Sequence, residues 1–122
     1  MKTNDNNLIA SKSFDFAVRC INLYKYLNYT TETKEFVLSK QLLRSGTSIG
    51  ANVEEAIGAH SKADFYAKIT IAYKEARETH YWLRLLHRTG YIKDLEYTSI
   101  SNDIEEILKI IAKIQITTKN NS

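Results

Sequence analysis

The chain has 122 residues, 43% of them hydrophobic and 25% charged, which supports one domain with a core and excludes an intrinsically disordered protein. Seventeen Lys and Arg residues oppose fourteen Asp and Glu residues, and this net charge of +3 permits contact with nucleic acid without arguing for it. No apolar run approaches the roughly 18 residues of a membrane span, and the polar residues 1–7 hold no secretory signal core, so we expect a cytoplasmic protein with a reduced Cys20.

Four amphipathic helices are predicted. The sequence contains no proline, which suits a mostly helical chain, because an interior proline costs about 3 kcal/mol. We expect a single domain over residues 1–122, with helices at about 11–29, 34–60, 62–89 and 94–117 and disordered tails at 1–7 and 119–122. Four such helices with short connections predict an all-α fold, an antiparallel up-and-down four-helix bundle.

The first helix is expected to begin at Ser11 or Ser13, either of which could cap it. Cys20 lies in its apolar face with no histidine nearby in the sequence, which favours a buried, inert thiol over a nucleophile. The residues at helical spacing on this face are Ile9, Phe16, Ala17, Cys20, Leu23, Tyr24 and Leu27. A second, weaker apolar strip on another side consists of Phe14, Val18 and Ile21.

The second helix, which follows a predicted turn at 30–33, is crowded with small residues. Gly46 and Gly50 form a Gly-xxx-Gly pair that admits a neighbouring backbone. The same inward side carries Phe36, Leu42, Leu43, Ile49, Val53 and Ile57, and the opposite side carries Arg44, Ser48, Ala51, Asn52, Glu55 and Ala59. We predict a helix-packing motif made of Arg44, Gly46, Ser48, Gly50, Asn52 and Glu55.

Asn52 and Glu55 are one helical turn apart and could instead share a hydrolytic pocket. We favour an ion pair of Glu55 with Arg44, Arg77 or a lysine of a neighbouring helix.

The third helix is predicted to begin with Ser61 as its cap and Asp64 near its positive end, and to stop at Gly90. Its inward stripe is Phe65, Ile69, Ala72, Ala76, Thr79, Leu83 and Leu86. A second stripe, predicted as an oligomer interface, contains Ile71, Glu75, Glu78, Trp82 and Leu85. Apolar residues on two sides predict a helix that is covered twice, once by the bundle core and once by another subunit.

A third stripe of the same helix combines cations with aromatic rings. It contains Tyr66, Tyr73, Lys74, Arg77, Tyr81, Arg84 and Arg88. Arginines bind phosphates and tyrosines stack on exposed bases, so the stripe is a candidate nucleic-acid site. Alternatively, the tyrosines pack at the core boundary and the arginines pair with acids of the last helix, such as Glu105 and Glu106.

The last helix carries a seam of Ile100, Ile104, Ile107, Ile111 and Ile114 at alternating four- and three-residue steps. The sequence has no Glu-x-x-His, no Gly-rich phosphate loop, no nucleophile elbow and no His-Glu-x-x-His. The three histidines, His60, His80 and His87, form no ligand set with Cys20. We therefore expect no metal, no cofactor and no enzymatic activity.

Three segments carry a resemblance to a known family. They are Arg44-Ser-Gly-Thr-Ser-Ile-Gly-Ala-Asn-Val-Glu-Glu-Ala56, then Ser61-Lys-Ala-Asp-Phe65, and Lys74-Glu-Ala-Arg-Glu78 with Tyr81-Trp-Leu83. From about residue 14 to 114 the chain resembles the four-helix bundle proteins encoded in intervening sequences of bacterial 23S ribosomal RNA genes, sometimes labelled S23 ribosomal proteins. It departs from the common form at Glu54, where that form has a small residue, and at Ala56, where it has glycine.

The resemblance implies an up-and-down bundle that assembles into a homopentameric ring, with no enzymatic activity attached to the family. Related proteins include the accessory proteins of diversity-generating retroelements, which bind nucleic acid and partner a reverse transcriptase. We therefore expect a homo-oligomer that binds RNA or DNA weakly through the third helix, with a nucleic-acid-processing protein as a further possible partner. In a symmetric ring, weak basic patches would add through multivalency. The alternative is a protein-interaction scaffold with no nucleic-acid role.

Overall fold

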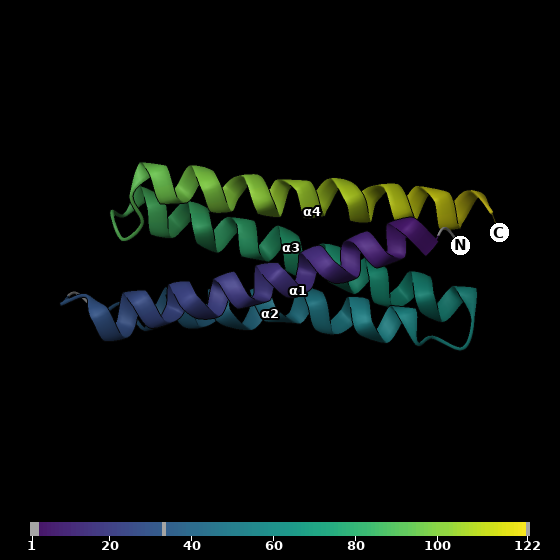
Figure 1. Ribbon diagram of the computed structural model, residues 1–122, viewed down its shortest axis with the longest axis horizontal. Helices are drawn as coiled ribbons and strands as arrows, with labels where there is room; N and C mark the ends of the chain where they lie inside the picture. The colour runs from purple at the N-terminus through teal and green to yellow at the C-terminus, as the bar shows by residue number, and fades with distance from the viewer. Residues whose placement is uncertain (1–2, 33, 122) are drawn as a thin grey trace.

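The computed structural model describes residues 3–32 and 34–121, and within these ranges the chain forms four α-helices and no strand. These are α1 (Thr3–Lys25), α2 (Val37–Ile57), α3 (Lys62–Arg88) and α4 (Asp94–Asn120). A π-helical segment, η1 (Tyr26–Thr30), continues α1. The helices run alternately up and down one long axis, with the start of α1 and the end of α4 at the same end of the molecule (Figure 1). The predicted all-α antiparallel bundle is confirmed.

Helix α1 begins well before the predicted start at residue 11. Ser13, a proposed cap, is buried inside the helix and donates to the carbonyl oxygen of Ala10 at 3.3 Å. The prediction of a disordered tail was therefore wrong for residues 3–7. Asp5 lies in the first turn, where a negative charge is favourable, and its carboxylate lies 3.7 Å from Nζ of Lys113 in α4. This polar turn is thus held by its position against α4.

The other predicted boundaries also differ in places. Helix α4 continues past residue 117 to Asn120, so residues 119–120 of the predicted tail are helical. Thr118, in this added turn, is buried. Helix α2 is shorter than the predicted 34–60, because Lys34 has a positive φ of 40° and Gly58 ends the helix. Residues 1, 2 and 122 of the predicted tails, and Thr33 of the predicted turn, lie outside the described ranges.

Hydrogen bonds made by two side chains, Asn28 and Glu35, stabilise the connection between α1 and α2. In η1, the Asn28 amide donates to the carbonyl oxygen of Tyr24 at 2.9 Å and to Oγ of Ser39 in α2 at 3.0 Å. The carboxylate of Glu35 then accepts from the backbone N–H groups of Val37, Leu38 and Ser39, at 3.1, 2.9 and 2.7 Å. Glu35 therefore satisfies three of the N–H groups that the start of a helix leaves unpaired.

Both predicted ends of α3 are confirmed. Oγ of Ser61 accepts from the backbone N–H of Asp64 at 3.0 Å, the bond of an N-cap. Beyond the end of α3, Gly90 has a φ of +89°, a conformation that a residue with Cβ adopts only at a cost.

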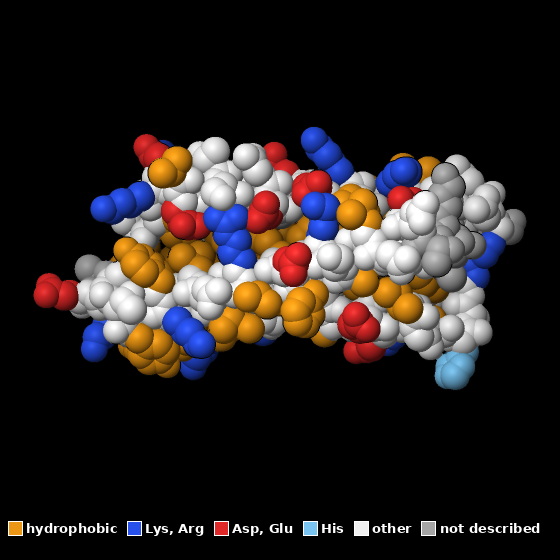
Figure 2. Space-filling model, viewed as in Figure 1, with side chains coloured by type: hydrophobic (Ala, Val, Ile, Leu, Met, Phe, Trp, Pro, Cys, Tyr) orange, Lys and Arg blue, Asp and Glu red, His pale blue; other side chains and the backbone are white. Residues whose placement is uncertain are grey.

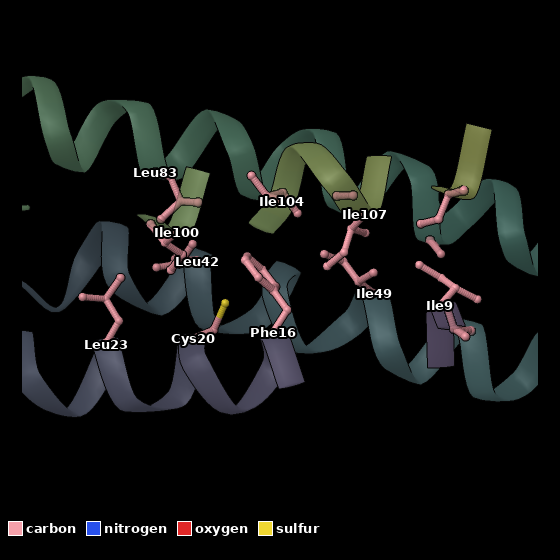
Figure 3. Close-up of a cluster of buried hydrophobic side chains, with 14 of the residues drawn as sticks. Ile9, Phe16, Cys20, Leu23, Leu42, Ile49, Leu83, Ile100, Ile104 and Ile107 are labelled. Atoms are coloured by element: carbon pink, nitrogen blue, oxygen red, sulfur yellow. The ribbon is translucent and has the colours of Figure 1, made fainter. Parts of the chain in front are cut away.

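The core is a single apolar cluster to which all four helices contribute (Figure 3). Every residue of the isoleucine seam of α4 is buried, as is every residue of the inward stripe of α3. On α2 the prediction was wrong for Phe36 and Ile57, which are 43% and 45% exposed because they lie at the two ends of the helix. The weaker strip of α1, Phe14, Val18 and Ile21, faces solvent.

Two glycines of α2 allow this helix to pack closely against α1. A Cβ on Gly46 would lie 2.4 Å from Sγ of Cys20, and a Cβ on Gly50 would lie 3.3 Å from the carbonyl oxygen of Ser13. Helix α2 also packs extensively on α3, and α3 on α4, whereas the contact between α1 and α4 is much smaller. Figure 1 shows α1 starting beside α4 and leaning away from it toward η1.

Candidate nucleic-acid interface

The basic and aromatic stripe of α3 lies outside the core along most of the helix. We call it the α3 stripe: Tyr66, Tyr73, Lys74, Arg77, Tyr81, Arg84 and Arg88. Its four cations and Tyr81 are exposed, whereas Tyr66 and Tyr73 are half-buried. At 1.5 Å per residue the stripe spans roughly 33 Å, enough for several successive phosphates.

The arginines of the α3 stripe have no acidic partner among the residues that the structure describes. Glu106 pairs instead with Lys12 of α1 at 3.0 Å, and Glu105 lies 3.9 Å from His80. The guanidinium of Arg84 lies over the ring of Tyr81, 5.6 Å from its centroid. Such a cation–π contact is worth about 0.5–1 kcal/mol at an exposed site and leaves the positive charge uncompensated.

His80 lies beside the same arginines. Partial burial lowers the pKa of His80, and the positive charge of Arg84 lowers it further. Glu105 opposes this shift, and Arg77 adds the smallest lowering effect. The imidazole therefore adds no charge to the α3 stripe at neutral pH.

The tyrosines of the α3 stripe have different surroundings. Tyr73 packs against the core, as the alternative interpretation expected. The ring of Tyr81 meets Trp82 edge-on at 5.2 Å between centroids, in addition to Arg84. Tyr66 lies nearer the start of α3 and faces open space beside α4.

The predicted interface stripe of α3 is partly covered by α2 of the same chain. Arg44 of α2 reaches Glu75 at 3.4 Å and also pairs with Glu78. The indole N–H of Trp82 donates to Glu78 at 3.1 Å. Trp82 and Leu85 are half-buried, so Ile71, at 37% exposed, is the apolar member of this stripe that is most open to solvent.

The predicted packing motif of α2 divides between two neighbours. Gly46 and Gly50 face α1, whereas Arg44 faces the acids of α3. The Asn52 amide donates back to the carbonyl oxygen and Oγ of Ser48, at 2.9 and 3.1 Å. Glu55 pairs with Lys68 of α3 at 3.2 Å. The structure therefore does not bring Arg44, Asn52 and Glu55 together, and the latter two have separate partners rather than a shared catalytic contact.

Sequence reasoning missed the role of Arg19, which bridges α1 to α4 where these helices diverge. Its guanidinium donates to Asp103 and Glu96, both at 2.7 Å, and to Ser99 at 2.8 Å. Partial burial lowers the pKa of Arg19, but the hydrogen bonds to Glu96 and Asp103 outweigh it and leave the pKa raised. The only signal in the sequence was an arginine beside the apolar face of the first helix.

Beyond Arg19 a groove of about 780 Å³ opens between α1 and the α3–α4 connection. Its lining combines apolar and aromatic side chains with polar and charged ones. The former are Leu23, Tyr26, Leu27, Tyr91 and Ile92, and the latter include Arg19, Asn22, Lys93 and Glu96. Figure 2 shows hydrophobic side chains gathered between α1 and α4 toward the η1 end. No pattern in the sequence indicated this groove, because it arises from the divergence of two helices.

Two further findings concern the described part of the chain only. None of its helices is both long and apolar enough to cross a lipid bilayer. None of its clusters of His, Cys, Asp and Glu brings together three side chains that could hold a metal ion.

Comparison with known proteins gives one family. The model of the family described as 23S rRNA-intervening sequence protein matches residues 5–113. A search of curated proteins found no match. Among solved structures, the chain is similar to a protein with unknown function from the S23 ribosomal protein family of Bacteroides thetaiotaomicron. The two are 57% identical, the TM-score is 0.86, and the match covers 91% of this chain and 97% of that one.

Proposed function

The chain belongs to the 23S rRNA-intervening sequence protein family, and from this premise we propose that it is a cytoplasmic, non-enzymatic accessory protein that binds RNA or DNA. In this proposal it assembles into a homo-oligomer, a pentamer as the family resemblance implies, and each copy binds weakly through the α3 stripe. The observation that carries the proposal is the exposure of Arg77, Arg84 and Arg88 without an acidic partner among the described residues.

Unpaired surface arginines favour a polyanionic ligand. An arginine that is paired within the chain must break its salt bridge before it binds phosphate. Arg77, Arg84 and Arg88 have no such bridge to break among the residues that the structure describes. One copy offers few contacts, so its affinity is expected to be low and to fall with salt as counterions return to the nucleic acid. Several copies in a ring would repeat the stripe and raise the overall affinity through effective concentration.

The test is a binding titration of labelled single-stranded RNA and DNA at low salt, by fluorescence anisotropy. Arg77→Glu combined with Arg84→Glu should weaken binding at least tenfold and make the fall of log affinity with log salt less steep by about 1.4, since each phosphate contact on a single strand contributes about 0.7. The matched control is Lys25→Glu with Lys40→Glu, the same charge change at exposed positions of α1 and α2. Absence of binding by the natural protein, or an equal loss in both variants, would defeat the proposal.

The oligomer is tested separately by light scattering. Ile71 is exposed, so Ile71→Glu should leave the fold of one chain intact while placing a charge in the proposed contact between copies. We expect the natural protein to have a multiple of the monomer mass at micromolar concentration and the variant to have a smaller mass. A monomer mass for the natural protein would contradict the assembly.

A second candidate function is a protein-interaction scaffold with no nucleic-acid role. The apolar groove between α1 and the α3–α4 connection favours it, since large exposed apolar surfaces often mark protein contacts. A protein partner that is retained after nuclease treatment and lost in Tyr26→Glu would support the scaffold. Tyr26 is 55% exposed at the groove, so this variant should fold.

A further inference from the structure

We propose that Tyr66 is a stacking platform for an unpaired nucleobase, so that the protein prefers single-stranded nucleic acid to a duplex. This inference rests on the proposed function and adds to it a ligand class and a place on the molecule. The place is the end of the bundle where α3 begins and α4 ends, remote from Arg84 and Arg88.

Tyr66 stands between two adjoining hollows. One has a volume of about 520 Å³ and is lined by Lys62, Ala63, Tyr66, Thr118 and Lys119. The other has a volume of about 390 Å³ and is lined by Tyr66, Tyr73, Ala112, Gln115, Ile116 and Lys119. Because Tyr66 lines both, its side chain borders open space in each of them.

The ring of Tyr66 also lacks a specific interaction within the described part of the chain. Within the described residues it makes no contact with another ring, no cation–π contact and no hydrogen bond, whereas Tyr81 contacts Trp82 and Arg84. Tyr73 packs against the core, where a base could reach only part of its ring. Of the three tyrosines of the α3 stripe, Tyr66 is therefore the one that borders open space without packing against the core, another ring or a cation of the described chain.

The charge around the two hollows suits the backbone of a single strand. Lys119 lines both hollows and Lys62 lines the first, and no acidic side chain of the described chain lines either. Lys62 donates to the carbonyl oxygen of Asn121, whereas Lys119 is exposed and makes no ion pair with a described residue. An aromatic platform between cations is the arrangement by which proteins bind single strands, since every base has a face that can stack.

A duplex cannot use this site in the same way. Its bases are stacked on one another inside the helix, so their faces are closed to a tyrosine. A duplex can still contact the arginines through its phosphates, but it gains nothing from Tyr66. The Tyr66 site is therefore expected to discriminate single-stranded from duplex nucleic acid, whereas the arginines bind both.

Anisotropy titrations with labelled single-stranded RNA, single-stranded DNA and duplex RNA of equal length test the inference. Tyr66→Ala should weaken binding of both single strands about tenfold or more and leave the duplex unchanged. Tyr66→Phe should bind like the natural protein, because the ring is kept. Tyr29→Ala, which truncates a tyrosine that is 69% exposed at the other end of the bundle, is the matched control and should have no effect.

The inference is overturned if Tyr66→Ala binds single strands normally, if it weakens duplex binding equally, or if the loss appears on only one of RNA and DNA. A loss of binding in Arg77→Glu with Arg84→Glu would still uphold the proposed function in each of these cases. If the natural protein binds none of the three probes, the proposed function and this inference both fail.

Discussion

Replacing Gly46 by alanine tests the close contact between α1 and α2. The added Cβ would lie 2.4 Å from Sγ of Cys20 and 3.2 Å from its Cβ, and the first distance is shorter than real Cβ contacts allow. Cys20 is 0% exposed, so its thiol cannot turn into solvent to relieve the overlap. We expect Gly46→Ala to destabilise the protein, although alanine is the better helix former.

The size of the effect follows from two opposed contributions. Overpacking a filled core costs about 1–3 kcal/mol, and alanine gains about 1 kcal/mol over glycine inside a helix. The net loss in free energy of unfolding is therefore as large as about 2 kcal/mol. In a Cys20→Ala background Sγ is gone and only the 3.2 Å contact between Cβ atoms remains. There Gly46→Ala should be close to neutral, so the coupling between the two substitutions is as large as the net loss, up to about 2 kcal/mol.

Urea unfolding followed by circular dichroism, at one protein concentration, measures all four proteins of this double-mutant cycle. Gly58→Ala is the control, because its added Cβ would lie 3.8 Å from the nearest atom, an ordinary contact. Its effect should stay within about 0.5 kcal/mol. An equal cost of Gly46→Ala with and without the Cys20 thiol would refute the reasoning, as would a simple gain in stability.

Three further changes test other parts of the structure. Glu35→Ala removes the acceptor for three N–H groups at the start of α2 and should cost about 1 kcal/mol of unfolding free energy. An unchanged thermal midpoint would show that water replaces the carboxylate as acceptor. Burial raises the pKa of Cys20 from 9.0 to about 12, so the stability it contributes is present below pH 9.0 and lost toward about pH 12. Cys20→Ala should reduce the loss of unfolding free energy at alkaline pH. Identical plots of unfolding free energy against pH for the variant and the natural protein would contradict this prediction. Burial and Arg84 lower the pKa of His80 below 6.5, so its contribution is present above that pH and lost as the pH falls. His80→Gln should therefore reduce the acid sensitivity of the urea midpoint, and an unaltered difference between about pH 7 and 5 would exclude this role.

The interior of the bundle could be predicted from the sequence because helical periodicity determines which residues share a face. The isoleucine seam of α4 and the inward stripe of α3 are apolar at every turn, and all their members are buried. The cap at Ser61 and the stop at Gly90 were predictable for a similar reason, since each depends on local chemistry alone.

Boundaries that depend on distant contacts could not be predicted in this way. Residues 3–7 are polar and read as a tail, yet they form the first turn of a helix that lies against α4, with Asp5 close to Lys113. The π-helical segment is likewise joined to α2 through Asn28 and Ser39, which are separated by the connection.

The choice of ionic partners was also beyond the sequence. Periodicity gives the face on which a charge lies but not the height at which two helices pass one another. The predicted pairing of Glu55 with a lysine of a neighbouring helix is confirmed by Lys68 of α3, but the sequence did not show which of the named partners it would be. Arg44 pairs with Glu75 and Glu78 instead of Glu55. The bridge from Arg19 to α4 depends on the same relative heights.

The meeting of the start of α1 and the end of α4 at one end of the bundle has a consequence for chain order (Figure 1). Asp5 and Asn6 line the same small hollow as Thr117 and Asn121, so a short linker could join the two ends. New ends could then be opened in the exposed turn between α2 and α3, which gives a circular permutant in the order α3, α4, α1, α2. Every helix would keep its neighbours, because the packing is encoded in the faces of the helices and not in the order in which the chain visits them.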